Sequence, residues 1–280
     1  MEALRQVEAW PSANASVAVL DAAGAVASAG DLARSYRWAS VTKLCTAYAC
    51  LVAAEEGTID LDEPAGPPGS TVRHLLAHAS GLPFHDGMPV GRAEARRVYS
   101  NPGIELAADT LAERAGMPFD AYLREAVIEP LGLRAELRGS PAADLWGTLD
   151  DLVLFARELL EPRLIARETL AEATSVQFPG LAGVLPDIGR FDPNDWGLGF
   201  ELKDGKDPHW SGTRTSPRTF GHFGGSGTFL WVDPEPRLAL ACLTDLEFGE
   251  WAMEAWPKLS DAVHAEAEPD AFERGEGHSQ

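Results

Sequence analysis

The chain has 280 residues, of which 45% are hydrophobic and 24% are charged, so we expect a soluble globular protein with a sizeable core. Its 43 acidic residues outnumber the 23 basic ones and leave a net charge of −20 at pH 7. Nucleic acids and anionic membranes attract positively charged proteins, so neither is an expected partner. A solvated acidic surface accounts for the charge most simply.

Targeting and redox signals are weak in this sequence. Residues 1–16 contain no apolar run long enough for a signal peptide, and no segment approaches the ~20 apolar residues of a membrane span. The cysteines are Cys45, Cys50 and Cys242, an odd number without the spacing of a metal site. We therefore expect a cytoplasmic protein with no metal and no cofactor, in which Cys45 and Cys50 are small core residues.

The first predicted elements are two strands, followed by a series of helices. Apolar residues on either side of the turn at 21–24 predict a β-hairpin formed by residues 16–20 and 24–29. Beyond it, hydrophobic residues recur at helical spacing between Gly and Pro breaks. Helices are expected at 40–56, 72–79, 102–115, 119–127, 149–160 and 165–173.

The pattern changes to strands after Trp196. Strands are expected at 197–202, 219–223, 227–232 and 238–244, and the last two are typical of an antiparallel hairpin. A closing helix is expected at 251–265, and the polar residues 266–280 are expected to form a disordered tail.

This order of elements predicts an α/β (α+β) fold, with an antiparallel sheet flanked by helices and an all-α domain inserted into it. Residues 1–38 and 185–265 would form the α/β sheet domain. Residues 39–184 would form the helical domain. No internal repeat is apparent.

The segment Ser40-Val41-Thr42-Lys43 carries the strongest chemical signal. It places a serine and a lysine one turn apart, on the same face of the predicted helix. A Ser-x-x-Lys pair is a signature of serine nucleophiles. Taken alone, the same residues would fit a helix-capping serine beside a solvated lysine equally well.

Two further short motifs follow in the chain. Tyr99-Ser100-Asn101 precedes a predicted helix, and His222-Phe223-Gly224 lies on a predicted strand. Tyr99 could instead be a core aromatic residue, Asn101 part of a helix-start turn, and His222 a structural strand residue.

These three motifs, in this order, resemble those of the serine β-lactamase and penicillin-binding-protein superfamily. The pattern is closest to the branch of class C β-lactamases, D-alanyl-D-alanine carboxypeptidases and related carboxylesterases. Four further segments are similar to landmarks of that branch, and the resemblance covers roughly residues 16–262. The segments are HLLAHASGLP at 74–83, EPLGL at 129–133, GTLDDL at 147–152 and WGLGF at 196–200.

The resemblance implies a role for each motif residue. Ser40 would be the nucleophile, and Lys43 and Tyr99 would move its proton and protonate the leaving group. Asn101 would hydrogen-bond the substrate or Lys43.

The backbone N–H groups of Ser40 and Gly225 would form the oxyanion hole. His222, Gly224 and Gly225 would contact the substrate, because a glycine-rich strand allows a ligand to approach the backbone closely.

One departure bears on the substrate. Penicillin-active members have Lys-Thr-Gly where this chain has His222-Phe223-Gly224, so the lysine and threonine that hold a substrate carboxylate are missing. An imidazole holds an anion weakly near pH 7, and the Phe223 side chain has no group that could bind an anion. The departure favours neutral ester or amide substrates.

We therefore predict a serine hydrolase that forms an acyl-enzyme on Ser40 and acts as an esterase or small-amide hydrolase. One alternative is a β-lactamase or D-amino-acid-specific peptidase. Another is a non-catalytic homologue that acts as a binding or assembly module. A small-molecule ester or amide is the expected partner, and the oligomeric state stays open. His74 and His78 have the spacing of zinc ligands, but they lack the glutamate of His-Glu-x-x-His, which favours a structural role.

Overall fold

A computed structural model describes residues 1–21, 23–24 and 26–267. Its centre is a six-stranded antiparallel sheet in the order β2-β1-β12-β11-β10-β9. The first predicted hairpin and the last one are therefore neighbours, with Val17 opposite Cys242. The strands are β1 (Ala15–Leu20), β2 (Val26–Ala29), β9 (Glu201–Leu202), β10 (Phe220–Gly224), β11 (Thr228–Asp233) and β12 (Leu238–Thr244).

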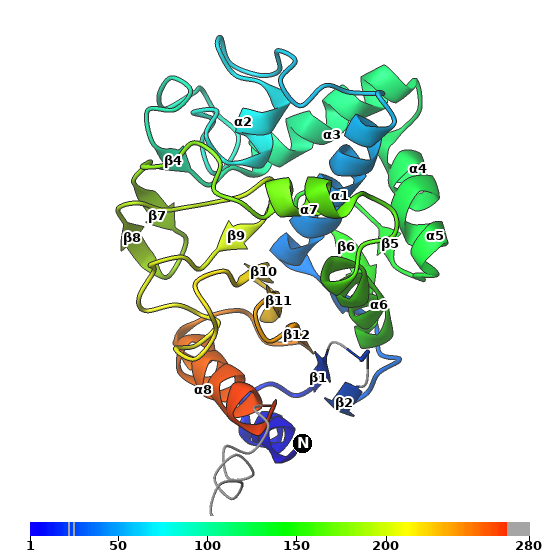
Figure 1. Cartoon of the computed structure of the whole chain (residues 1–280), viewed down its shortest axis with the longest axis vertical. Helices are drawn as coiled ribbons and strands as arrows, with labels where there is room; N and C mark the ends of the chain where they lie inside the picture. Colours follow the sequence, from blue (N-terminus) through cyan, green and yellow to red (C-terminus); the bar gives the residue numbers. More distant parts are fainter. Residues whose placement is uncertain (22, 25, 268–280) are drawn as a thin grey trace, which may run out of the picture.

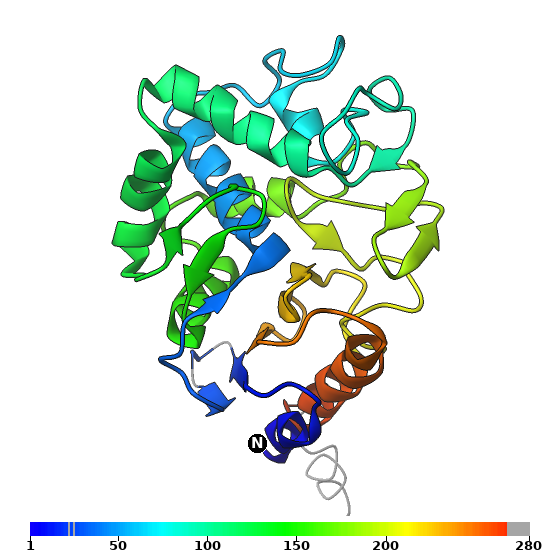
Figure 2. The same ribbon diagram turned by 180° about the vertical axis from the view of Figure 1, so that it is seen from behind.

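The sheet separates two hydrophobic cores because alternate residues of a strand point to opposite faces. Along β12, Ala239 and Ala241 belong to the core beneath α6 (Leu149–Leu160). Leu240 and Cys242 belong to the core beneath α8 (Glu250–Ala267). The N-terminal 3₁₀ helix η1 (Glu2–Ala9) lies beside α8, as both views show (Figures 1 and 2).

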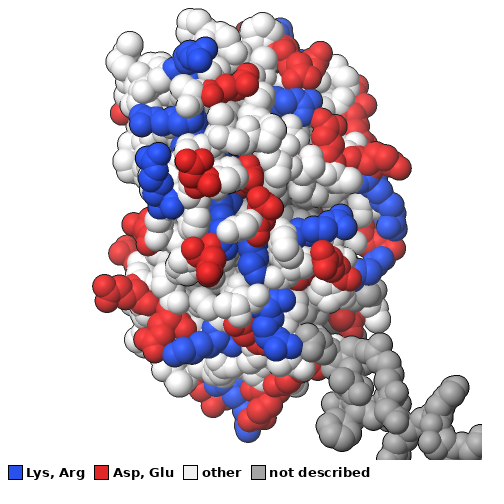
Figure 3. All heavy atoms as spheres, turned by 60° about the vertical axis from the view of Figure 1, so that its left-hand side comes forward, with Lys and Arg blue, Asp and Glu red and all other residues white. Residues whose placement is uncertain are grey.

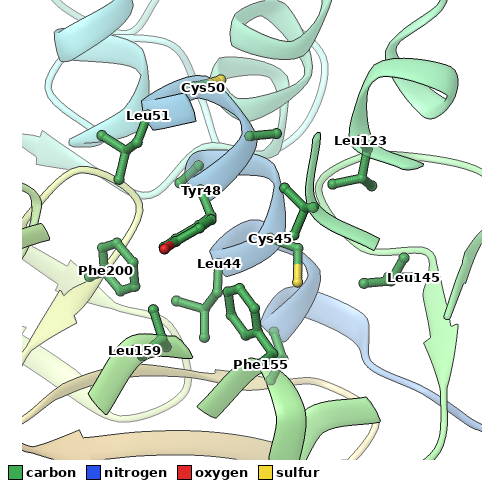
Figure 4. Close-up of a cluster of buried hydrophobic side chains, with 14 of the residues drawn as sticks. Leu44, Cys45, Tyr48, Cys50, Leu51, Leu123, Leu145, Phe155, Leu159 and Phe200 are labelled. Atoms are coloured by element: carbon green, nitrogen blue, oxygen red, sulfur yellow. The ribbon is translucent and has the colours of Figure 1, made fainter. Parts of the chain in front are cut away.

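Helix α1 (Thr42–Glu55) runs through the middle of the larger core. Tyr48, for example, packs edge-on against Phe155 of α6 at 5.6 Å between ring centroids (Figure 4). Cys45 and Cys50 are buried thiols, as predicted. The other helices here are η2 (Ala39–Val41), α2 (Val72–Leu76), α3 (Asn101–Ala115), α4 (Phe119–Leu123), the π-helix η3 (Arg124–Ile128), α5 (Glu129–Leu131) and α7 (Arg167–Ala173).

Two small sheets accompany these helices, and the sequence patterns did not predict them. Their strands have only two or three residues, too few for a periodic pattern. One sheet joins β3 (Tyr36–Arg37), β6 (Leu145–Gly147) and β5 (Glu136–Leu137). The other joins β4 (Arg97–Val98), β7 (Gly183–Leu185) and β8 (Gly189–Phe191).

Two predicted elements are shorter than expected, and in both the backbone enters the left-handed region. The strand expected at 197–202 is limited to Glu201–Leu202, because Gly199 has a φ of 79° and the Gly197 N–H bonds back to the Phe200 carbonyl. The helix expected at 72–79 ends at Leu76, two residues before His78 with its φ of 56°.

The expected antiparallel sheet flanked by helices is confirmed, whereas the boundaries of the inserted domain stay a prediction. Helix α8 continues through Ala267, two residues into the segment expected to be a tail. The remainder of that segment, 268–280, lies outside the described residues. Among the described helices, none is both long and apolar enough to cross a membrane.

Candidate active site

Ser40 lies in the single turn of η2, directly before α1. The preceding residue, Ala39, has a φ of 46°, a strained conformation for a residue with a side chain. The hairpin that follows β10 holds this segment in place. Thr228 Oγ1 donates to the Trp38 carbonyl at 2.9 Å, and Ser226 Oγ donates to the Arg37 carbonyl at 2.7 Å.

The two glycines of the predicted substrate strand have different surroundings. A Cβ on Gly224 would lie 2.6 Å from the Trp38 carbonyl oxygen, so the chain itself occupies the space that a side chain would need. A Cβ on Gly225 would meet no atom within 4 Å. The Gly225 N–H has no hydrogen-bond acceptor among the described residues, which leaves it able to donate to an oxyanion.

Lys43 is fully buried, and its amine faces the predicted nucleophile. Nζ lies 3.1 Å from Ser40 Oγ and donates to the Ala142 carbonyl at 2.7 Å. Burial lowers the pKa of the Lys43 ammonium to about 7, and the negative charge of Glu105 opposes this shift. Near neutral pH much of the amine is therefore unprotonated and able to accept a proton.

Tyr99 reaches the same point from the connection between β4 and α3. Its ring packs against His78 and Trp196, and Lys43 Nζ lies 4.8 Å from the ring centroid. Burial raises the pKa of the Tyr99 phenol, and the Ser40 hydroxyl opposes that shift more weakly. Tyr99 is consequently a neutral hydrogen-bond donor at pH 7 rather than a phenolate.

His222, in the middle of β10, completes the group. Its Nδ1 lies 2.6 Å from the Phe223 carbonyl, which can only accept, so Nδ1 carries the hydrogen. Its Nε2 is then an acceptor and lies 3.4 Å from the Tyr99 hydroxyl. Burial lowers the pKa of His222 to about 3, and the nearby Lys43 charge lowers it further. His222 is therefore a neutral acceptor near pH 7.

Asn101 lies at the first turn of α3, close to Tyr99 in the chain. Its Oδ1 is buried without a hydrogen-bond partner among the described residues. The structure does not join Asn101 to Lys43, which bonds to Ala142 instead. The unpaired amide oxygen leaves an acceptor that a substrate N–H or O–H could satisfy.

His78 is a site residue whose role was not predicted. Its Nδ1 accepts the Ser100 N–H at 3.2 Å, and its ring lies 4.6 Å from both the Tyr99 and the Trp196 rings. Burial holds the pKa of His78 well below its usual value. His74 has different partners, Thr71 and Glu94, so the two histidines belong to separate hydrogen-bond networks.

Ala142 and Glu105 were also not predicted to act at the site. Both act on Lys43, Ala142 through its carbonyl oxygen and Glu105 through its charge. No sequence signal distinguishes one backbone carbonyl from another, whereas His78 lies within the segment at 74–83 that resembles a family landmark.

Comparison with known proteins finds similar sequences and similar folds. The crystal structure of a β-lactamase from Mycobacterium bovis, Mb2281c, is 51% identical in sequence, with a TM-score of 0.93 over 95% of this chain and 99% of that one. EstCE1, described as a hydrolase with promiscuous acyltransferase activity, shares the fold at 17% identity, with a TM-score of 0.76 over 94% of this chain and 97% of that one.

A curated relative from Escherichia coli K12 is the D-alanyl-D-alanine-carboxypeptidase/endopeptidase AmpH. It is 27% identical over 35% of each chain, so the match spans about a third of that protein's length. The Beta-lactamase family model matches residues 35–135 and 134–264, which is most of the chain. The chain therefore belongs to the β-lactamase family and has the fold of its hydrolases.

Proposed function

We propose that this protein is a serine hydrolase that acylates Ser40 and releases the acyl group to water, with esters or small amides as substrates. One observation carries the proposal. A buried lysine amine with a pKa of about 7 lies 3.1 Å from a serine hydroxyl at the start of a helix. A base with a pKa close to the working pH transfers protons most effectively.

In the acylation step, the Ser40 hydroxyl gives its proton to Lys43 as Oγ forms a bond to the substrate carbonyl carbon. The negative charge that develops on the carbonyl oxygen is stabilised by the N–H groups of Ser40 and Gly225. Losing one such donor typically costs about 3 kcal/mol of transition-state stabilisation. The positive end of α1 adds to this stabilisation.

When the bond from the carbonyl carbon to the leaving oxygen or nitrogen breaks, that atom takes the Tyr99 phenolic proton. The proton on Lys43 then restores the phenol. In deacylation a water molecule gives one proton to Lys43, and its oxygen forms a bond to the acyl carbon. The bond from that carbon to Ser40 Oγ then breaks, Oγ takes the proton back from Lys43, and the acid product leaves.

The surroundings of β10 favour substrates that carry no carboxylate next to the ester or amide bond that is cleaved. His222 is neutral, so it offers no cation to a substrate carboxylate there. Phe223 turns into the apolar core, against Phe248 and Trp256. The fold relative EstCE1 is described as a hydrolase with promiscuous acyltransferase activity, which is consistent with acyl transfer on this fold.

The test is incubation with p-nitrophenyl acetate, followed by intact mass measurement and peptide mapping. We expect a burst of p-nitrophenol and an acetyl adduct on Ser40. Ser40→Ala should abolish both, whereas Ser35→Ala, at an exposed serine earlier in the chain, should leave both unchanged. If esters, penicillins and fluorophosphonates all fail to label Ser40, the proposal is wrong and a non-catalytic homologue is the better interpretation.

A second candidate is β-lactam hydrolysis, favoured by the 51% identity with a protein described as a β-lactamase. The two candidate functions are distinguished by comparing kcat/KM for nitrocefin with kcat/KM for p-nitrophenyl acetate. We expect the ester to be the better substrate, because His222-Phe223-Gly224 offers no cation to the carboxylate of a β-lactam.

A further inference from the structure

A pocket of about 640 Å³ adjoins the reaction centre on the side of Tyr99. Strand β4 and the β7–β8 hairpin form its walls, and Phe84 closes one edge. Tyr99 is the residue shared by the two: it lines this pocket, and its hydroxyl interacts with the side chain of Ser40. The volume of the pocket is within the range of small-molecule sites.

The mouth of the pocket is apolar. Phe84 and Val184 line it and are 37% and 53% exposed, unusually high fractions for large hydrophobic side chains. The loop that follows Phe84 exposes two more, Met88 and Val90. Arg96, another lining residue, donates to the Val90 carbonyl at 3.5 Å, which places this loop against the rim. Clustered exposed apolar side chains typically mark a binding site.

Arginine side chains surround the same opening. Arg96 and Arg190 line the pocket, are exposed, and have no ion pair within the described chain. Ten other arginines of that part of the chain do pair with carboxylates. The face that carries β7 and β8 shows lysines and arginines spread among the acidic residues, despite the net charge of −20 (Figure 3).

The lining is positively charged as a whole. Arg97 is buried and bonds to the carbonyls of Ala77, Gln177, Phe178 and Asn194, so it ties the walls together. Asp187 is the one carboxylate among the described lining side chains, against three guanidinium groups. An anion at the mouth would meet Arg96 and Arg190, and guanidinium groups match carboxylates geometrically.

From these features we infer that the pocket binds an apolar part of the substrate that ends in an anionic group, such as a carboxylate, remote from the reacting bond. This inference rests on the proposed hydrolase function and names its substrate class. The anion would be held by Arg96 and Arg190, at a different place from the Lys-Thr-Gly position where this chain has His222-Phe223-Gly224.

The first experiment compares matched esters that differ only in the distal charge. One pair is the p-nitrophenyl monoester of suberic acid and p-nitrophenyl octanoate. The other pair carries the carboxylate on the leaving group, as acetyl esters of 4-hydroxyphenylbutyrate and 4-butylphenol. We expect a higher kcat/KM for the anionic member of one pair, which identifies the side of the ester that enters the pocket, and a smaller preference at high salt.

The preference is measured as the ratio of kcat/KM for the anionic ester to kcat/KM for the neutral ester. The double variant Arg96→Gln, Arg190→Gln should lower this ratio by about 3- to 10-fold, as expected for two exposed charge contacts. Arg92→Gln removes an exposed arginine of the same loop that does not line the pocket, and should leave the ratio unchanged. An equal ratio in wild type and double variant, or the same loss with Arg92→Gln, would overturn the inference.

A binding measurement separates the two proposals. Calorimetry on the Ser40→Ala protein should show that it binds 4-phenylbutyrate more tightly than 4-phenylbutanamide. Adding Arg96→Gln and Arg190→Gln to this variant should make the two affinities equal. If wild type hydrolyses neutral esters but no carboxylate preference appears in either assay, the pocket inference fails alone. If 4-phenylbutyrate binds through the arginines while Ser40 reacts with no ester, the proposed function fails and the pocket stands.

Discussion

The Tyr99 hydroxyl lies 3.4 Å from Nε2 of His222, the ring nitrogen that carries no hydrogen. The carbonyl of Phe223 fixes this tautomer by occupying Nδ1 at 2.6 Å. The imidazole therefore accepts from Tyr99 and gives the phenolic proton a defined direction. In this site the histidine positions a proton donor and does not supply a charge.

Removal of the Tyr99 hydroxyl should separate proton transfer from packing. Tyr99→Phe keeps the ring contacts with His78 and Trp196 but deletes the donor. We expect kcat for ester hydrolysis to fall by about 10²- to 10⁴-fold, with little change in Tm. Tyr122→Phe, which removes a hydroxyl bonded to Glu56 far from the site, is the matched control. Equal activity of Tyr99→Phe and wild type would exclude Tyr99 as the acid.

The Lys43 amine should set the pH dependence of the reaction. Because it must be neutral to accept the Ser40 proton and its pKa is about 7, kcat/KM should rise with pH and level off above about 7. Lys43→Arg keeps a permanent cation and should be inactive across that range. A wild-type profile that is flat from pH 5 to 9 would contradict this assignment.

Lys43 should also make stability depend on pH. Its pKa is about 7 when folded and 10.5 in its ordinary state, so between these values the unfolded chain binds the extra proton. The free energy of unfolding should therefore gain a contribution that rises from pH 7 towards pH 10. Lys43→Met should lack this contribution and, at pH 7, equal or exceed wild type in Tm while being inactive. Urea unfolding at several pH values measures both effects.

The buried histidines should make the fold sensitive to acid. His222 has a pKa of about 3 when folded against an ordinary 6.5, so the unfolded chain takes up a proton first as the pH falls. Stability should be lost between pH 6.5 and about 3, by up to about 1.4 kcal/mol per pH unit for this residue. His222→Gln should show a shallower loss, with the exposed His85→Gln as the control position. Identical slopes for His222→Gln and wild type would refute the prediction.

Gly224 should tolerate no side chain, because β10 packs directly on the nucleophile segment. In Gly224→Ala the new Cβ would meet the Trp38 carbonyl at 2.6 Å and Thr228 Oγ1 at 2.5 Å. We expect a loss of about 1–3 kcal/mol in stability, together with weaker Ser40 acylation as that segment shifts. Gly205→Ala, which meets no atom within 4 Å, is the control, and comparable melting curves for the two variants would contradict this account.

Local sequence patterns predicted the long elements and part of the site. The apolar periodicity before Gly57 predicted α1, and the apolar runs on either side of the turn at 233–236 predicted the β11–β12 hairpin. The spacing of Ser40 and Lys43 placed both on one turn, where their side chains are 3.1 Å apart. Such patterns succeed because they depend on neighbours within a few residues.

The tertiary structure alone decided the rest, because it depends on contacts between residues distant in the chain. Burial among helices, rather than the Ser-x-x-Lys spacing, lowers the pKa of Lys43. The tautomer of His222 and its place beside Tyr99 follow from packing β10 against the β4–α3 connection. The β4–β7 pairing joins residues 97–98 to residues 183–184, and these strands are too short to show in the sequence. The sequence by itself determined which residues could carry acyl transfer, and only the folded chain determined their protonation states, because burial and neighbouring charges set pKa values.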